Sequence, residues 1–354
     1  MKQEIIDKIN RLANQDEPFL FVINYQGDKA FIRQLSDINP EECLFDFEGR
    51  GNSSDEMKNN SEKIAEISWQ IAPPLYEDYE RSFDIVKNNI MAGNSYLTNL
   101  TCKVPVSCNL SLEDIFHRAK GKYKLLLRRK RNLTPFVCFS PETFVRIKNG
   151  RIYSYPMKGT LDASLPDAEK QLMEDRKEAA EHATIVDLIR NDLSRVAENV
   201  RVDKYRYIDV LHTNKGDILQ TSSEISGRLP EDYQEHLGEI LDAQLPAGSI
   251  TGAPKDKTMQ IIHEAEGYDR GFYTGIMGIY DQGELNSAVM IRFIEEETSP
   301  VDFEADGKKN FKASEGMGDE ASRELYFKAG GGITSKSDCR KEYEEVIQKI
   351  YLPF

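Results

Sequence analysis

Residues 153–195 join a strand-like segment to a long helix-like one, and this pairing constrains the fold more than any other part of the chain. Residues 151–155 alternate with aromatic side chains, Pro156 interrupts the strand pattern, and Gly159 permits a sharp bend of the backbone. We therefore expect Lys158 to lie in a tight turn at the exit of a strand, where side chains commonly point into a cleft.

The second half of this stretch has the spacing of an amphipathic helix. Pro166 and Asp167 suit a first helical turn. An apolar stripe then recurs at helical spacing, formed by His182, Val186, Ile189 and Leu193. Glu181 lies on a neighbouring face of the predicted helix and is expected to face the turn that carries Lys158. Taken alone, a turn lysine and a helix glutamate are more often solvated surface residues than a site.

Composition narrows the class of protein. With 354 residues and 39% hydrophobic content, the chain can bury a substantial core. The net charge of −14 argues against nucleic acid or an anionic membrane as a partner, although local cations can still bind a small anionic substrate. Five cysteines without zinc or redox spacing, a charged amphipathic N-terminus and no bilayer-length apolar run predict a cytoplasmic protein with reduced thiols.

The remaining chain alternates short helices and strands. We expect a small N-terminal α/β unit at residues 1–78, with a helix over 4–12 and a hairpin of 19–25 with 30–32, packed on a catalytic core at 79–354. Further helices are predicted over 79–91, 232–244 and 255–264. Further strands are predicted over 125–127, 136–139, 143–147, 205–210, 217–225, 272–280 and 285–294.

Two segments of the C-terminal half stand out. Arg292 interrupts an otherwise apolar predicted strand, where a strand-end arginine reaching water is the ordinary interpretation. Residues 295–323 are acidic, poor in apolar side chains and punctuated by glycine, so we expect a flexible insertion. Asp338 then caps a last helix whose residues Glu342, Glu345 and Lys349 share one face.

Three motifs carry a resemblance to a known family. Residues 156–160 (Pro-Met-Lys-Gly-Thr), 186–193 (Val-Asp-Leu-Ile-Arg-Asn-Asp-Leu) and 248–255 (Gly-Ser-Ile-Thr-Gly-Ala-Pro-Lys) are similar to the chorismate-utilising enzymes. The match runs from about residue 79 to the end of the chain. It implies an α+β fold, a sandwich of two large antiparallel sheets flanked by helices.

The resemblance also implies an active site. It places Glu142 in a Ser-Pro-Glu turn as the acid that protonates a departing ring hydroxyl, and Lys158 as the decisive catalytic residue. Mg²⁺ is implied as the cofactor, held by Glu181, Glu342 and Glu345. The implied substrate-binding residues are Gly159, Thr160, Ser249, Tyr273, Arg292, Gly331, Gly332 and Lys349.

Lys158 makes the chain similar to the aminodeoxychorismate synthase branch, in its synthase subunit, whereas anthranilate synthases typically carry alanine there. The implied reaction is amination of chorismate to 4-amino-4-deoxychorismate through a lysine-linked intermediate, which serves 4-aminobenzoate and folate biosynthesis. Anthranilate synthase and isochorismate or salicylate synthase remain alternatives, as does a non-catalytic homologue that senses chorismate or tryptophan. Gln220 and Lys336 depart from the family pattern, which has histidine and aspartate at these positions.

The ammonia for this reaction is expected from elsewhere. Nothing in the sequence resembles a glutamine amidotransferase, and none of the cysteines lies in a nucleophile-elbow context. We therefore expect a separate glutaminase subunit as partner, with no nucleic-acid or membrane partner.

Overall fold

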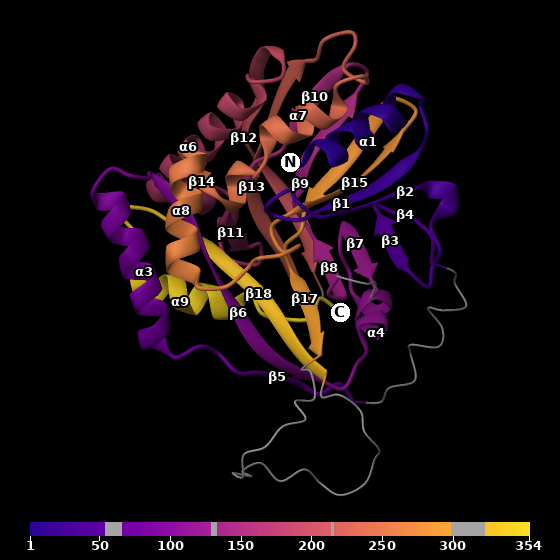
Figure 1. Cartoon of the computed structure of the whole chain (residues 1–354). Helices are drawn as coiled ribbons and strands as arrows, with labels where there is room; N and C mark the ends of the chain where they lie inside the picture. The colour runs from indigo at the N-terminus through magenta and orange to yellow at the C-terminus, as the bar shows by residue number, and fades with distance from the viewer. Residues whose placement is uncertain (54–65, 129–132, 214–215, 299–322) are drawn as a thin grey trace, which may run out of the picture.

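A computed structural model describes residues 1–53, 66–128, 133–213, 216–298 and 323–354. Its architecture is α+β: two large antiparallel sheets form the core, and helices lie around them, as expected from the sequence (Figure 1). Each sheet has nine strands among the described residues.

The first sheet, sheet A, runs in the order β11, β13, β10, β9, β16, β15, β1 and β2, with β12 paired to β13. Its strands are β1 (Phe19–Ile23), β2 (Ala30–Gln34), β9 (Thr143–Lys148), β10 (Arg151–Ser154), β11 (Met157–Asp162), β12 (Glu198–Thr213), β13 (Gly216–Arg228), β15 (Ile276–Asp281) and β16 (Glu284–Val289).

The second sheet, sheet B, runs in the order β14, β6, β18, β17, β8, β7, β3 and β4, with β5 paired to β6. Its strands are β3 (Cys43–Phe47), β4 (Arg50–Gly51), β5 (Trp69–Ile71), β6 (Leu97–Cys108), β7 (Tyr123–Leu127), β8 (Phe136–Ser140), β14 (Gly252–Ala253), β17 (Phe293–Thr298) and β18 (Arg323–Ile333).

The helices cover the outer faces and ends of the two sheets. In Figure 1, α3, α8 and α9 lie beside β6 and β18, whereas α1, α6 and α7 lie over sheet A. The helices are α1 (Gln3–Asn14), α3 (Tyr76–Met91), α4 (Leu112–Arg118), α5 (Ala168–Glu174), α6 (Arg176–Leu193), α7 (Leu237–Gln244), α8 (Lys255–Glu266) and α9 (Cys339–Gln348), with short 3₁₀ turns η1 (Leu35–Asp37) and η3 (Gly248–Ile250). None of the helices in the described ranges is long and apolar enough to cross a membrane.

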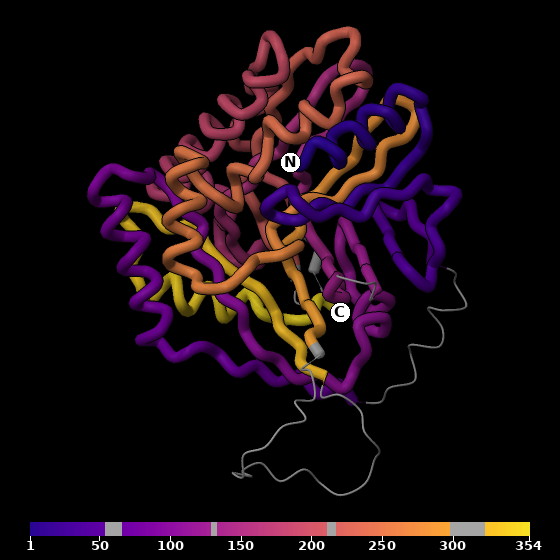
Figure 2. Tube along the Cα trace, in the orientation of Figure 1, coloured from indigo at the N-terminus to yellow at the C-terminus, as the bar shows by residue number. Residues whose placement is uncertain are grey.

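The N-terminal residues contribute strands to both sheets. Strand β1 pairs with β15, and β3 pairs with β7, so the indigo start of the chain runs beside segments from far along the sequence (Figure 2). Buried side chains of α1 and β1, including Ile9 and Phe21, share one apolar cluster with residues of α6, α7 and β15. The boundary near residue 78 stays a prediction from the sequence.

Several expected segments differ from the structure. The helix expected over 232–244 begins only at Leu237, because the preceding residues form successive turns, and the strand expected over 272–280 begins at Ile276. The strand expected over 285–294 is two strands, since β16 belongs to sheet A and β17 to sheet B.

The start of the insertion expected over residues 295–323 was also wrong. Residues 295–298 belong to β17, and Glu295 is buried against Lys328, 2.8 Å away. An acidic run therefore continues a core strand, because a buried lysine compensates its first carboxylate. Residues 299–322 of the expected insertion lie outside the described residues.

Candidate active site

Lys158 lies within a strand, not in the turn that the sequence predicted. Pro156 interrupts the strand run only briefly, and both β10 and β11 pair with β13. A β-bulge falls between Lys158 and Thr160, with Gly159 at φ +73°. Such bulges redirect neighbouring side chains, so the glycine sets the direction of Lys158 through the strand rather than through a turn.

Gly159 is needed for space as well as for its backbone conformation. A Cβ atom at residue 159 would lie 2.8 Å from Glu178 Oε2, which is closer than real contacts allow. Glu178 Oε2 is itself buried without a hydrogen-bond partner. The bulge therefore packs against the Glu178 side chain of α6, which would have to move to admit a side chain at residue 159.

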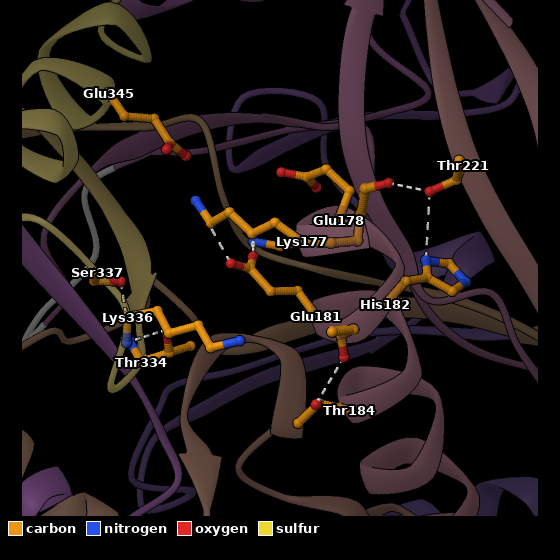
Figure 3. Close-up of polar contacts among 12 residues, drawn as sticks. Lys177, Glu178, Glu181, His182, Thr184, Thr221, Thr334, Lys336, Ser337 and Glu345 are labelled. Atoms are coloured by element: carbon orange, nitrogen blue, oxygen red, sulfur yellow. Dashed lines mark hydrogen bonds and ion pairs between the residues drawn. The ribbon is translucent and has the colours of Figure 1, made fainter. Parts of the chain in front are cut away.

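The expected meeting of Lys158 with Glu181 is present. Lys158 Nζ lies 3.0 Å from Glu181 Oε2. Lys177 Nζ lies 3.7 Å from the other oxygen of that carboxylate (Figure 3). Burial lowers the pKa of Lys158, but Glu181, Glu178 and Glu345 more than offset this, so its pKa is raised above the ordinary value. In this arrangement Lys158 is a protonated amine held by a carboxylate.

The two glutamates of α9 face the same space. Asp338 caps the helix by accepting a hydrogen bond from the backbone N–H of Lys341 at 3.1 Å. Burial raises the pKa of Glu342, and the neighbouring Glu345 raises it further. Lys158 lowers the pKa of both glutamates, which places them and Lys158 within electrostatic reach of one another. Figure 3 shows Glu345 directed from α9 toward the space in front of Glu181.

These carboxylates do not form a finished metal cluster. No group of three or more His, Cys, Asp or Glu side chains within the described ranges stands close enough together to hold a metal ion. The donor chemistry nevertheless fits Mg²⁺, because Glu181, Glu342 and Glu345 offer hard oxygen ligands from two helices on either side of one space. Each of the three has a lysine in electrostatic reach, the type of neighbour that a divalent cation would replace.

Glu142 lies between β8 and β9 and is hydrogen-bonded by a residue from a distant part of the sequence. Ser249 of η3 donates its hydroxyl hydrogen bond to Glu142 Oε1 at 2.5 Å. Burial raises the pKa of Glu142, while Ser249, Arg292 and Lys349 partly offset that rise. The carboxyl group therefore keeps its proton to a higher pH than an exposed glutamate, which is what a general acid requires.

Arg292 does not sit within a strand as predicted. It lies at φ +55° in the short crossing between β16 and β17, where the chain passes from one sheet to the other. Its Nε atom is buried without a hydrogen-bond partner, and its guanidinium lies 5.6 Å from the ring of Tyr351. A strained backbone and an unpaired buried donor make Arg292 a candidate for binding an anionic ligand.

The glycines of β18 border the same space. A Cβ atom at Gly331 would lie 3.7 Å from both Glu342 Oε2 and Lys349 Nζ. Lys349 Nζ donates to the carbonyl of Gly330 at 3.0 Å and pairs with Glu345 at 2.7 Å. Strand β17 begins opposite Lys328, so among the described strands only β6 flanks Gly331 and Gly332. The N–H groups of Asn99 and Thr101 bond to Thr251 and Glu266 instead of β18. By the alternation of an antiparallel pair, the backbone groups of Gly332 therefore face the open side of β18 and are available to a ligand, whereas those of Gly331 face β6.

Two expected substrate residues are less clearly placed. Tyr273 is buried in the core beside Phe293, with ring centroids 5.9 Å apart, although the charge of Arg292 still reaches its hydroxyl. Thr160 is exposed on β11 opposite Gln220, whose side-chain oxygen is buried without a hydrogen-bond partner. The amide at the position of the family's histidine thus lies next to the bulge.

Sequence reasoning missed the polar support behind Lys158. The carbonyl of Lys158 accepts a hydrogen bond from Thr221 on β13, and His182 lies between Thr221 and Ser223, with Nε2 2.6 Å from Ser223 Oγ. Burial, with Arg206, lowers the pKa of His182 to about 4, so it is neutral. The helical stripe identified His182 as a core residue but gave no signal for its partners, which come from a distant strand.

Comparison with known proteins decides the family. A model described as chorismate binding enzyme matches residues 13–307. The chain belongs to this family. Family members bind chorismate, and the antiparallel sandwich of this chain is the fold of the family's solved structures.

Three proteins illustrate what this chain is similar to within the family. The chain is 46% identical to an uncharacterized PabA-like protein of Haemophilus influenzae, over 99% of this chain and 97% of that protein. It is 30% identical to aminodeoxychorismate synthase component 1 of Salmonella typhimurium, over 77% of this chain and 56% of that protein. The crystal structure of anthranilate synthase component I from Streptococcus pneumoniae matches with a TM-score of 0.61 at 25% identity, over 80% of this chain and 58% of that one. The chain thus spans just over half the length of these two named synthases.

Proposed function

We propose that this chorismate-binding protein aminates chorismate at ring carbon 4, forming 4-amino-4-deoxychorismate, the precursor of 4-aminobenzoate for folate synthesis. The observation that carries the proposal is the amine of Lys158, aimed by the Gly159 bulge into a space bordered by Glu181, Glu345 and Glu342. An amine in this place supplies a nucleophile that an alanine at the same position would lack.

Binding of one of the two substrate carboxylates is supported by two cations. Arg292 has an unpaired donor and reaches Glu142 electrostatically, and Lys349 does so from α9. We assign one chorismate carboxylate to Arg292, Lys349 and the open backbone groups of Gly332, with Gly331 providing room beside them. The planar guanidinium can bind a carboxylate through two hydrogen bonds.

The second carboxylate belongs to the side of Glu181, Glu342 and Glu345, the residues that would hold Mg²⁺. Mg²⁺ held there would withdraw charge from the ring carboxylate, and Glu181, once engaged by the ion, would no longer stabilise the protonated form of Lys158. Lys158 adds to ring carbon 2 as a neutral amine. Glu142 gives its proton to the hydroxyl on carbon 4, which leaves as water while the two ring double bonds shift.

The second half of the reaction returns the enzyme to its starting state. Ammonia attacks carbon 4, the double bonds shift back, and the bond between Lys158 and carbon 2 breaks with its electron pair returning to the amine. We assign the supply of ammonia to a separate glutamine amidotransferase subunit, and the reaction to the cytoplasm. The exposed Thr160 and the core residue Tyr273 are the weakest assignments for direct substrate contact.

Product identification tests this function directly. The purified chain is incubated with chorismate, MgCl₂ and ammonium chloride, and the products are separated and identified by mass spectrometry. We expect 4-amino-4-deoxychorismate. Fluorescent anthranilate would identify an anthranilate synthase, isochorismate would mean that water is the nucleophile, and unchanged chorismate would indicate a binding protein without this activity.

A further inference from the structure

A small cavity lies directly beside Glu142, between sheet A and helix α6. About 20 Å³ is open to the centres of water-sized molecules, which is room for at least one molecule of that size. Its polar lining includes Glu142, Ser249, Ser154, Asp192 and Gln244, and the rest is mostly apolar, with Ile189, Leu193 and Val289 among it. A cavity of this size suits a molecule about as small as water and is too small for chorismate or glutamine.

A second, larger hollow approaches the cavity from the surface. This groove has about 530 Å³ open by the same measure and is lined by the start of the chain, the turn around Gln26, the end of α6 and the connection from α7 to α8. Asp192 lines both the groove and the cavity. Asp192 therefore forms part of the wall between the surface groove and the cavity.

The wall between the two hollows is a set of three polar residues rather than an apolar plug. Asp192 Oδ2 lies 3.0 Å from Lys255 Nζ, and Lys255 Nζ also donates to the carbonyl of Gln244 at 2.8 Å. Gln244 Nε2 in turn donates to the carbonyl of Asp192 at 2.9 Å. We call Asp192, Gln244 and Lys255 the latch. Lys255 is its most flexible member, because a long lysine side chain can swing into the groove without moving a helix.

The latch is connected to Glu142 through the turn that contains Gly248 and Ser249. A Cβ atom at Gly248 would lie 2.9 Å from Asp192 Oδ2, so Asp192 packs on the turn that carries Ser249. Ser249 holds Glu142 by its hydrogen bond. A continuous series of contacts therefore runs from the groove through Lys255, Asp192 and Ser249 to Glu142.

We propose that this path, from the groove past the latch and through the cavity, is the route by which ammonia reaches ring carbon 4. The proposal rests on the amination function above and extends it with an entry route that is separate from the substrate space. Because the proposed reaction has Glu142 protonate the hydroxyl on carbon 4, a cavity beside Glu142 lies near the carbon that ammonia must attack.

The proton balance of the step fits this position. Glu142 becomes a carboxylate when its proton leaves with the hydroxyl as water. Ammonia then forms the bond to carbon 4, and the new ammonium group gives one proton to the Glu142 carboxylate. The acid is thereby restored within the same cavity, with no further reactant.

Paired substitutions at Ile189, which lines the cavity from α6, test the route. Ile189→Phe fills the cavity and Ile189→Ala enlarges it. Each variant is assayed for the adduct that chorismate forms on Lys158 without ammonia, by intact-protein mass, and for amination with ammonium chloride. We expect the adduct to form normally in both variants. The kcat/KM for ammonium should fall about tenfold or more in Ile189→Phe, a loss confined to the ammonia-dependent half-reaction.

Methylamine distinguishes a route from general damage. Ile189→Ala should accept methylamine better than the wild type does, because a wider cavity passes the added methyl group. Ser154→Val fills the cavity from β10 and serves as the second plug if Ile189→Phe does not fold. A folded plug variant that forms the adduct and keeps the wild-type kcat/KM for ammonium overturns the route while the amination function stands. A wild-type protein that forms no amino product overturns both.

Discussion

Lys158 and Glu181 form an ion pair between β11 and α6, with Lys158 Nζ 3.0 Å from Glu181 Oε2. The same carboxylate is the one proposed to bind Mg²⁺, and the same amine is the proposed nucleophile. Without metal, the proposed nucleophile and the proposed metal ligand therefore pair with each other. Binding of Mg²⁺ to Glu181 would remove this partner from Lys158 and so change the protonation of its amine.

Replacing Lys158 should abolish amination without unfolding the protein. Lys158→Ala and Lys158→Arg both remove the nucleophilic amine, but arginine keeps the positive charge beside Glu181. We expect both to lower formation of 4-amino-4-deoxychorismate by orders of magnitude, with melting temperatures close to that of the wild type. Lys177→Ala is the matched control, because Lys177 also faces Glu181 but is more exposed, and it should keep most of the activity. Undiminished amination by Lys158→Arg would leave only direct attack by ammonia.

The glutamates assigned to Mg²⁺ should act as one unit. We expect Glu181→Gln and Glu345→Gln each to weaken Mg²⁺ binding, measured by isothermal titration calorimetry in the absence of substrate, and to lower activity. The double variant should lose little more than either single variant, because groups that serve one ligand are not additive. Glu344→Gln, on the same helix, is the control. Activity that persists in a chelator would contradict the metal assignment.

The bulge at Gly159 can be tested apart from Lys158 itself. Gly159→Ala places a side chain at φ +73° and 2.8 Å from Glu178 Oε2. The left-handed conformation alone costs about 1–2 kcal/mol for a non-glycine residue. Gly150→Ala provides that strain without the clash, since φ is +68° there and nothing lies within 4 Å of the added atom. We expect both variants to lose stability in urea unfolding, but only Gly159→Ala to lose amination, because only there does the added atom displace a neighbour, the Glu178 carboxylate that acts on Lys158. Equal activity in the two variants would show that the bulge does not direct the lysine.

Such a bulge shows where prediction from sequence ended. Residue patterns predicted many of the strands and helices but not β3, β5, β6, β18 or α4. The family resemblance implied that Lys158, Glu181, Glu142 and the α9 glutamates belong to one site. Neither could place Lys158 within a strand, because the bulge exists only through pairing with β13, more than fifty residues further along the chain. Arg292 was misplaced for the same reason, since the crossing between sheets depends on the partners of β16 and β17. The contact of Ser249 with Glu142 is likewise a long-range one, which local periodicity does not report.

The hydrogen bond from Ser249 should set the pH range in which Glu142 works. That bond stabilises the carboxylate and so lowers the pKa of Glu142 against the larger effect of burial, which raises it. Ser249→Ala should therefore raise the pKa further, and the fall of kcat/KM for chorismate at high pH, where the acid loses its proton, should move to higher pH. Ser154→Ala, which removes a hydroxyl from the same cavity without touching Glu142, is the control. A limb that stays in place, or moves to lower pH, would mean that Glu142 is not the acid that this limb reports.

The ammonia source gives the last prediction. The proposed site has two cations for one substrate carboxylate, three glutamates that would hold Mg²⁺ near the other, and a lysine as nucleophile, while no amidotransferase motif was found in the sequence. Purified alone, the chain should therefore turn over chorismate with ammonium chloride, and faster as pH rises and the fraction of free ammonia grows, until Glu142 loses its proton. It should show no turnover with glutamine. An added glutaminase that forms a complex with the chain should confer glutamine use. If ammonia from both sources passes through the same cavity, Ile189→Phe should lower the glutamine-driven rate together with the ammonium-driven rate. Glutamine-driven turnover by the isolated chain, confirmed free of other subunits by mass spectrometry, would show that it releases ammonia itself.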